Sequence, residues 1–221
     1  MSHKHTLEID YLSVEGSKSD KPPVYIVKEL FDDNENNWKI SDDEHAKTSL
    51  SNGKFIFQHK KEDNSYFSWN HFDLSDDEPF TIETTLKHKA GQTNFAYGLI
   101  WGIIDVKNFF TFNISETGYY RISRNKDSSW TDYVGWTHSN YINTNGESNE
   151  LSIKKIDNKL KFYINDNFVN QIDFEEFFAN GIGFVIWGQQ TIEIEDLMID
   201  GFKEEFKIDM EDFEDVFDYW W

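Results

Sequence analysis

Between residues 24 and 199 the sequence is a succession of short apolar or aromatic runs separated by turn-forming residues. The separating segments, among them SNG, SDDEP, KAGQ, SETG, IDNK and INDN, are rich in Gly, Asn, Asp and Ser, which favour turns. Runs of strand length at this spacing, with no regular helical period between them, predict an antiparallel β-sandwich. The runs are VYIVKELF, KFIFQHK, SYFSWNHFDL, FTIETTLKHK, FAYGLIWGIID, NFFTFNIS, GYYRISRN, WTDYVGWTHS, ELSIKKI, KLKFYIN, GIGFVIWG and TIEIEDLMI.

Several of these runs alternate between apolar and polar residues. In FTIETTLK, Ile82 and Leu86 fall on one face of a strand and Glu83 falls on the other. The run KLKFYIN alternates in the same way. One buried face and one solvent-exposed face are typical of strands in an antiparallel sheet that covers a core on one side.

Two runs, YGLIWG at residues 97–102 and GFVIWGQ at residues 183–189, repeat Ile-Trp-Gly and are apolar on both faces. Such strands belong in the middle of a sheet whose second face is also sheltered, and glycine there lets a ring or another backbone approach closely. The concave side of a curved sheet is such a face. We therefore expect both runs to be central strands of one curved sheet. In one possible arrangement the two strands are direct neighbours.

The chain of 221 residues is long enough for one large β domain, and its aromatic content of 17 % indicates a core built largely from rings. We divide it into an N-terminal extension (1–23) that could add one strand, a sandwich (24–202) and an acidic aromatic tail (203–221). Residues 173–181, DFEEFFANG, are expected to form a short helix capped by Asp173 and ended by Gly181. No cysteine is present, so disulfides and thiolate chemistry are excluded.

The formal net charge of −20 bears on the partners and the location of the protein. A phosphate backbone and an anionic membrane surface both attract cationic side chains, so the charge argues against nucleic-acid and membrane binding. It favours basic partners or cations. The N-terminus lacks the basic and apolar segments of a secretion signal, which indicates a cytoplasmic protein. Secretion with the signal removed is the alternative left open.

From about Leu30 to Phe202 the chain resembles the concanavalin A-like lectin/glucanase superfamily, in its laminin G-like and bacterial jelly-roll branches. The resemblance is carried by ELFDDNENNWKI, GKFIFQHK, the run from Phe80 through YGLIWG, NFFTFNISETGYYRI, the hairpin LSIKKIDNKLKFYINDNFV, and GIGFVIWGQQTIEIEDLMIDGF. It implies a jelly-roll sandwich whose ligand site is the concave sheet or the loops at its rim. Lectins, glycosidases and adhesion modules all share this fold, so the resemblance implies no single activity.

Retaining glucanases of this fold carry a pattern similar to Glu-x-Asp-x-x-Glu on one strand. Their chemistry requires two carboxylates about 5.5 Å apart. The nearest match here is EIEDLM, in which Glu193 and Glu195 share a face but Met198 takes the third position. We interpret this pair as a solvated acidic face on the sheet opposite the ligand site, and the lone Glu83 as a surface residue. No catalytic residue is assigned.

We assign no cofactor and no metal-binding residue to the chain. Calcium remains an alternative, since lectins and laminin G-like modules bind calcium through oxygens of rim loops. The segments FDDNENN (31–37) and YINDNF (163–168) contain suitable oxygens. Asp and Asn are also common in turns for conformational reasons alone.

Exposed aromatic rings flanked by polar groups would suit a ligand on the concave face. The segment SSWTDYVGWTHSNY offers Trp130, Tyr133 and Trp136, and the two Ile-Trp-Gly runs offer Trp101 and Trp187. We predict that these five residues form the ligand site. The alternative is that some of them belong to the core, as tryptophans on sandwich strands often do.

The tail KEEFKIDMEDFEDVFDYWW carries apolar residues at spacings of four, three, four and three. On a helix they would form one stripe with most of the acidic residues elsewhere. The stripe could bind a groove in a partner protein or pack on its own sandwich, and the acidic body slightly favours a partner. The residues assigned to partner binding are Phe206, Met210, Phe213, Phe217, Trp220 and Trp221.

These features favour a non-catalytic interaction module as the function. The module would engage a protein partner with a basic, apolar groove, or a second copy of itself, through the tail or the concave face. The alternative is a carbohydrate-binding lectin-like domain or a glycoside hydrolase acting on polysaccharide.

Overall fold

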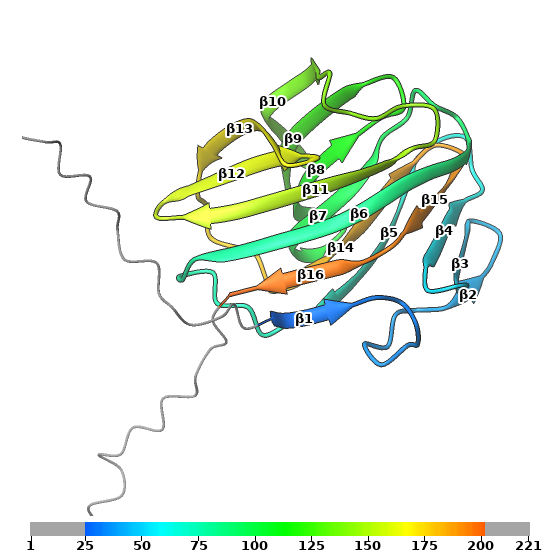
Figure 1. The fold of residues 1–221 in the computed structure, drawn as a ribbon, viewed down its shortest axis with the longest axis horizontal. Coiled ribbons are helices and arrows are strands. Elements are labelled where there is room, and N and C mark those ends of the chain that lie inside the picture. Colours follow the sequence, from blue (N-terminus) through cyan, green and yellow to red (C-terminus); the bar gives the residue numbers. More distant parts are fainter. Residues whose placement is uncertain (1–24, 202–221) are drawn as a thin grey trace, which may run out of the picture.

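The computed structural model describes residues 25–201, and these form two antiparallel β-sheets packed face to face (Figure 1). The described residues contain strands and connecting segments but no helix. The larger sheet has ten strands in the order β13-β12-β11-β6-β15-β4-β3-β2, and β16 also pairs with β6 and carries β1 on its far side. Its strands are β1 (Tyr25–Glu29), β2 (Ser41–Asp42), β3 (Ala46–Leu50), β4 (Phe55–His59), β6 (Phe80–Gly91), β11 (Ser148–Ile156), β12 (Lys159–Ile164), β13 (Asn167–Asp173), β15 (Gln190–Ile194) and β16 (Leu197–Asp200).

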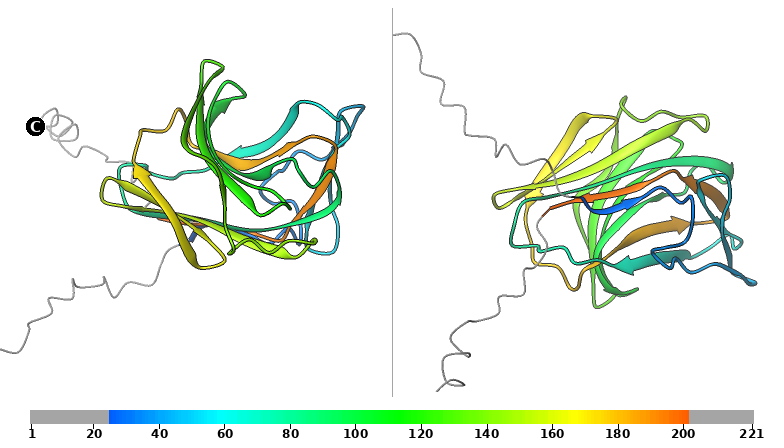
Figure 2. Two further views of the ribbon diagram at one scale, coloured as in Figure 1. Left: turned by 90° about the horizontal axis from the view of Figure 1, so that it is seen from above. Right: turned by 60° about the horizontal axis from the view of Figure 1, so that its bottom comes forward.

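The smaller sheet has six strands in the order β10-β9-β8-β7-β14-β5. It is strongly curved: seen from above in Figure 2, the green strands of the β8 to β10 region rise away from the larger sheet. The concave side of the smaller sheet therefore faces outward, and its convex side covers the core. Its strands are β5 (Ser65–His71), β7 (Tyr97–Asp105), β8 (Asn108–Ile114), β9 (Tyr119–Lys126), β10 (Ser129–His138) and β14 (Gly181–Trp187).

Aromatic rings fill the space between the two sheets. Trp38 and Phe55 lie with their ring centroids 5.5 Å apart, and Phe184 lies 5.4 Å from Trp38. The loop that carries Trp38 is held by the buried carboxylate of Glu29, which accepts hydrogen bonds from Phe31 N at 2.7 Å, Asn36 Nδ2 at 2.7 Å and Trp38 Nε1 at 3.0 Å. A buried carboxylate with three donors is well satisfied, so it can order a loop.

The position predicted for the two Ile-Trp-Gly runs is confirmed. They lie in β7 and β14, which are direct neighbours in the middle of the smaller sheet. Both strands are buried on both faces over nearly their whole length. Glycine is required where neighbouring strands approach most closely: a Cβ at Gly183 would lie 2.1 Å from Ser68 O, and one at Gly98 would lie 2.2 Å from Phe112 O.

The prediction of a short helix at residues 173–181 is wrong. β13 ends at Asp173, and an irregular segment connects it to β14. Backbone N–H groups of this segment bond to distant partners, since Phe177 N donates to Asp76 Oδ2 at 2.9 Å and Phe178 N donates to Gly102 O at 3.2 Å. The three phenylalanines of the segment pack against the core. A segment this short cannot pay the cost of nucleating a helix when tertiary partners compete for its donors.

Each of the twelve predicted runs contains at least one strand, but three strands were missed. β2, β3 and β13 are short or polar, and the last run contains both β15 and β16. The N-terminal extension (1–23) and the tail (203–221), with its predicted helix, lie outside the described residues. Within residues 25–201 no helix has the length and apolar character needed to cross a membrane.

A buried polar pair joins β7 to the turn between β8 and β9 and to the segment between β10 and β11. Tyr97 is fully buried, and its hydroxyl donates to Glu116 Oε1 at 2.9 Å. Glu116 Oε2 accepts from Gly146 N at 2.8 Å. Burial, followed by the neighbouring Glu116 carboxylate, raises the pKa of the Tyr97 hydroxyl well above its ordinary value. Burial lowers the pKa of the nearby His88 ring below its ordinary value.

Replacing Gly183 by alanine should destabilise the protein. The added Cβ would meet backbone atoms, which cannot turn aside as a side chain can, so we expect the free energy of unfolding to fall by about 1–3 kcal/mol. Denaturant unfolding of Gly183→Ala measures the loss. Gly135→Ala is the control, because nothing lies within 4 Å of its added Cβ, and it should stay within about 0.5 kcal/mol of the parent. Equal losses in both variants would contradict the close-approach argument.

The Tyr97 hydroxyl should make stability fall at alkaline pH. Because its folded pKa is raised, the unfolded chain releases this proton above about pH 10 while the folded chain keeps it, so the contribution of Tyr97 shrinks as pH rises. The difference in unfolding free energy between the parent and Tyr97→Phe should decrease by up to about 1.4 kcal/mol per pH unit above pH 10. Urea unfolding of both proteins from pH 8 to pH 11 measures it, and a difference that stays constant would contradict the assignment.

Candidate functional site

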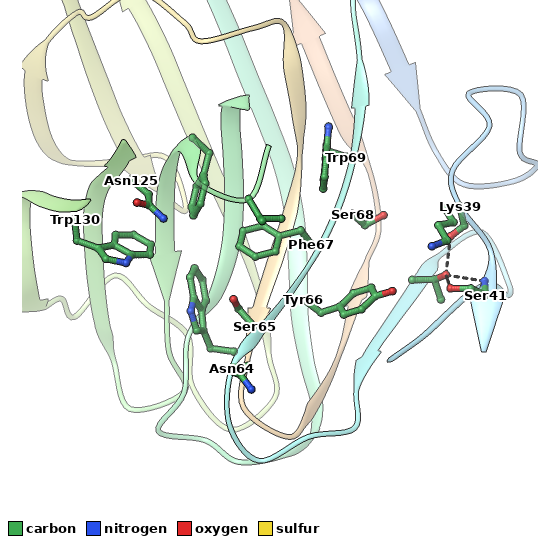
Figure 3. Close-up of a pocket in the computed structure, with 14 residues that line it drawn as sticks. Lys39, Ser41, Asn64, Ser65, Tyr66, Phe67, Ser68, Trp69, Asn125 and Trp130 are labelled. Carbon is green, nitrogen blue, oxygen red and sulfur yellow. Dashed lines mark hydrogen bonds between the residues drawn. The ribbon is translucent and has the colours of Figure 1, made fainter. Parts of the chain in front are cut away.

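A groove of about 800 Å³ lies on the concave side of the smaller sheet and continues past the edge of β5 toward β2 and β3 (Figure 3). We call it the concave groove. Figure 3 shows Trp130 and Asn125 on one side, Phe67 in the middle, and Ser41 and Lys39 on the far side. The lining residues are Lys39, Ser41, Thr48, Asn64, Ser65, Tyr66, Phe67, Ser68, Trp69, Val106, Phe109, Asn125, Trp130 and Trp187.

Four aromatic rings form a continuous floor in the concave groove. The Phe109 ring lies 5.1 Å from Phe67 and 5.5 Å from Trp130, both nearly edge to face. Trp187 lies 6.4 Å from Phe67 and 6.5 Å from Trp130. Such edge-to-face contacts hold rings in fixed orientations, so the floor is a preformed surface.

Strand alternation explains why these rings meet. Ile100, Phe109 and Val185 are fully buried in a second apolar cluster, separate from the main core, and Phe67, Trp69 and Trp187 pack on it. They come from the four adjacent strands β5, β14, β7 and β8, whose other face supplies the main core. The sheltered concave face predicted from the two Ile-Trp-Gly runs is this cluster.

Trp130, the most exposed ring of the floor, is held by charge as well as by packing. The Arg121 guanidinium carbon lies 5.2 Å from the centre of its ring. Arg121 Nε donates in turn to Asp132 Oδ1 at 2.7 Å. A guanidinium over an indole face is a favourable cation–π contact, so it limits the motion of the indole.

Trp187 is positioned through its backbone. Gln190 Nε2 donates to Trp187 O at 2.6 Å and to Ala96 O at 3.0 Å, and Trp187 N donates to Ala96 O at 3.0 Å. Gly188 follows with φ +64°, a conformation in which a Cβ would meet the Phe95 ring at 2.5 Å. The glycine of the second Ile-Trp-Gly run is therefore needed to end β14 and present the Trp187 ring.

Polar groups beside the floor include acceptors without a partner. Asn125, only 6 % exposed, lines the groove opposite Trp130 in the β9–β10 ladder, and no described residue donates to its Oδ1. The hydroxyl of Ser123, two residues earlier on β9, likewise has no partner among residues 25–201. Both oxygens are also shielded from solvent, so a ligand in the groove could reach Asn125 only through the rest of its amide.

The described residues that line the concave groove include no carboxylate. The pair considered from the sequence lies at the end of β15 of the larger sheet, with Glu193 on the strand and Glu195 just after it. Glu193 Oε2 is 3.3 Å from Lys89 Nζ, and Glu195 Oε1 is 2.8 Å from Lys54 Nζ. Glu83, on β6 of the same sheet, lies 3.2 Å from Lys154 Nζ. These are surface ion pairs away from the groove, and the two carboxylates that a glycosidase needs are not found among the described lining residues.

The five predicted ligand residues do not come together. Trp130 and Trp187 line the concave groove. Trp101 is fully buried in the main core, with its ring stacked 5.6 Å from Phe110, so its expected position on the concave face is wrong. Tyr133 packs against the core and donates to Glu175 Oε1 at 2.6 Å, and Trp136 is 49 % exposed outside the groove. Ligand binding by Trp130 and Trp187 stays a prediction.

Sequence reasoning missed the contribution of β5 and β9. Phe67 and Trp69 alternate with serine and asparagine in SYFSWN, a pattern that could have marked a strand with one aromatic outer face. Nothing in the sequence distinguishes Asn125 from the other asparagines of the chain. Its place in the lining of the groove follows from the strand pairing, which only the structure gives.

The loop FDDNENN uses several of its oxygens internally. Asp33 Oδ1 accepts from Glu35 N at 3.0 Å, and Asn34 Oδ1 accepts from Trp38 N at 2.8 Å. In the second segment, Asn165 Oδ1 accepts from Glu150 N at 2.8 Å. Across residues 25–201 no three His, Asp or Glu side chains are grouped so that they could hold a metal ion. Calcium binding stays a prediction.

Comparison with known proteins rests on structure alone, since no protein-family model and no curated protein matches the sequence. The chain is similar to the carbohydrate-binding module CBM66 from Bacillus subtilis, with a TM-score of 0.57 and 15 % identity over 75 % of this chain and 96 % of that chain. It is similar to an endo-β-1,3-glucanase from Pyrococcus furiosus, with a TM-score of 0.56 and 10 % identity over 81 % of this chain and 95 % of that chain.

A third similar structure is the CBM2 module of the evolved Dit protein of Lactobacillus casei BL23 phage J-1, with a TM-score of 0.54 and 10 % identity over 80 % of this chain and 94 % of that chain. At this level of identity the likenesses establish the fold. The chain has a two-layer antiparallel jelly-roll sandwich like those of these structures, and its place in the concanavalin A-like superfamily stays a prediction. The laminin G-like branch stays a prediction.

Proposed function

We propose that the protein is a non-catalytic carbohydrate-binding module and that the concave groove is its binding site. A sugar ring presents C–H groups on its faces and hydroxyls at its edges. The faces suit an aromatic floor, and the hydroxyls suit amides and hydroxyls at the sides, a combination typical of small-molecule sites. The concave groove offers both, with Trp130 and Trp187 in the floor and Asn125 beside them.

The observation that carries this proposal is the aromatic floor of the concave groove, in which Trp130 and Trp187 lie beside the amide of Asn125 (Figure 3). An apolar groove alone would suit many ligands. Indole rings flanked by amides and hydroxyls, such as those of Asn125 and Ser65, suit a ligand that covers an aromatic face and forms hydrogen bonds at its edges, and a sugar ring does both.

Two further observations support a binding role without catalysis. The described lining residues carry no carboxylate, although the whole chain has 41 acidic residues among 221. Two of the similar structures are carbohydrate-binding modules by name. The protein partner expected for the tail stays a prediction, because residues 203–221 lie outside the described part of the chain.

Removing either indole of the groove floor should weaken sugar binding. A glycan array with the full-length protein identifies a ligand, and titration calorimetry then compares variants. Trp130→Ala and Trp187→Ala should each weaken binding at least about tenfold, since an aromatic anchor in an interface contributes on the order of 1.4 kcal/mol or more. The control is Trp136→Ala, which removes an equally exposed indole outside the groove. Weaker sugar binding in Trp136→Ala alone would place the binding site outside the concave groove.

A bound oligosaccharide should remain intact. Because hydrolysis requires a pair of carboxylates beside the glycosidic bond, prolonged incubation with the full-length protein should leave the oligosaccharide length unchanged in mass spectrometry. Appearance of shortened products that are lost with Trp130→Ala would show that the site is catalytic and would refute the non-catalytic assignment.

A further inference from the structure

The two sheets of residues 25–201 expose five edge strands, and four of them are blunted against pairing. β10 has two register shifts against β9, and β13 has one against β12. β1 has a register shift and carries the exposed Lys28, and β2 is only two residues long. Bulges, charges and short length are the usual means by which proteins prevent an edge from pairing with another chain.

The fifth edge, β5, has none of these features. It runs for seven residues, Ser65–His71, and pairs with β14 without a register shift. Its sequence SYFSWNH contains no Lys, Arg, Asp, Glu or Pro. Among the described residues no strand pairs with its other side. A long, regular, uncharged edge is a template for strand addition.

The phase of the β5–β14 ladder shows which backbone groups face outward. Gly188 N donates to Asn64 O at 3.1 Å, and Phe72 N donates to Asn180 O at 3.1 Å. Hydrogen-bonded pairs alternate along an antiparallel ladder, so Tyr66 and Ser68 bond to β14. The N–H and C=O groups of Ser65, Phe67 and Trp69 therefore point away from β14, and no described residue bonds to them.

These outward groups open into the concave groove. Five consecutive residues of β5, Ser65 to Trp69, line it, so both faces of the strand and the edge between them border the cavity. Figure 3 shows Phe67 on the side of the aromatic floor, and Tyr66 on the side of Ser41. In a strand laid along this edge, alternate side chains would contact the aromatic rings, and the remaining side chains would contact hydroxyl groups.

We propose that β5 accepts an extended, basic segment of a partner protein as a seventh strand of the smaller sheet. Only a polypeptide backbone offers donors and acceptors with the repeat of the open edge. The groove lining carries Lys39 and no carboxylate, so the preference for Lys or Arg comes from the net charge of −20 over the whole chain, which also repels an acidic segment and a second copy of this chain. Side chains of the added strand would cover Phe67 and Trp69, so the peptide and a sugar in the groove should exclude each other.

The test uses amide hydrogen exchange of the full-length protein, with and without the blocked peptide Lys-Val-Thr-Val-Thr-Val-Lys. In the free protein the amides of Phe67 and Trp69 should exchange rapidly and those of Tyr66 and Ser68 slowly. Peptide should slow Phe67 and Trp69 and leave the β10 edge unchanged. Rapid exchange of Phe67 and Trp69 at saturating peptide would overturn the proposal, as would slow exchange before peptide is added, which would show that the chain itself or a second copy covers β5.

N-methylation of the peptide tests the ladder directly. Methyl groups on alternate amides that face β5 remove the inter-strand bonds and should weaken binding by about tenfold or more, whereas methyl groups on the other alternate amides should not. Equal effects of the two patterns would rule out strand addition. The outcome is independent of sugar binding, because no sugar is present in the assay.

A matched pair of protein variants tests which edge of the smaller sheet the peptide binds. Ser65→Lys puts a gatekeeping charge on β5, and Ser129→Lys makes the same change on β10, the opposite edge of the same sheet. Peptide binding should be weakened by Ser65→Lys and unchanged by Ser129→Lys. The reverse result would assign the peptide to β10 and overturn the proposal for β5.

Discussion

The structure depends on the burial of both faces of β7 and β14. Strands in the middle of a curved sheet can be apolar on both sides only if a second layer of side chains covers the concave face. Phe67, Trp69 and Trp187 supply that layer, and glycines at positions such as Gly183 allow the neighbouring strands to approach closely enough for it to form. The curvature, the second apolar cluster and the groove above it are therefore one physical feature.

The same layer determines what the concave face can bind. The rings that shelter the two central strands are too few to bury themselves fully, so Trp130 and Trp187 remain available to a ligand. The polar groups beside them are incompletely bonded within the described residues. At the other side of the groove, the open edge of β5 offers a second kind of recognition, through the backbone. Sugar and peptide would use overlapping surfaces of one groove.

The fold was largely predictable, because strand length, turn residues and alternation are local properties that each run displays by itself. Alternation also gave the buried face of β6 and β12 correctly. The short helix at 173–181 was wrong because its capping pattern is local, whereas its N–H groups bond to Asp76 and Gly102, far away in the chain. The strands β2, β3 and β13 were missed because pairing, more than composition, makes them strands.

The sequence by itself determined the all-β class, the central place of the two Ile-Trp-Gly runs and the lack of a glucanase carboxylate pattern. Only the tertiary structure decided which tryptophans reach the groove: Trp101 faces the core and Trp187 faces the groove. In strands that are apolar on both faces, alternation cannot distinguish the two sides, because neither side is marked by polar residues. The register of β14 against β7 makes that choice, and pairing between distant segments sets the register.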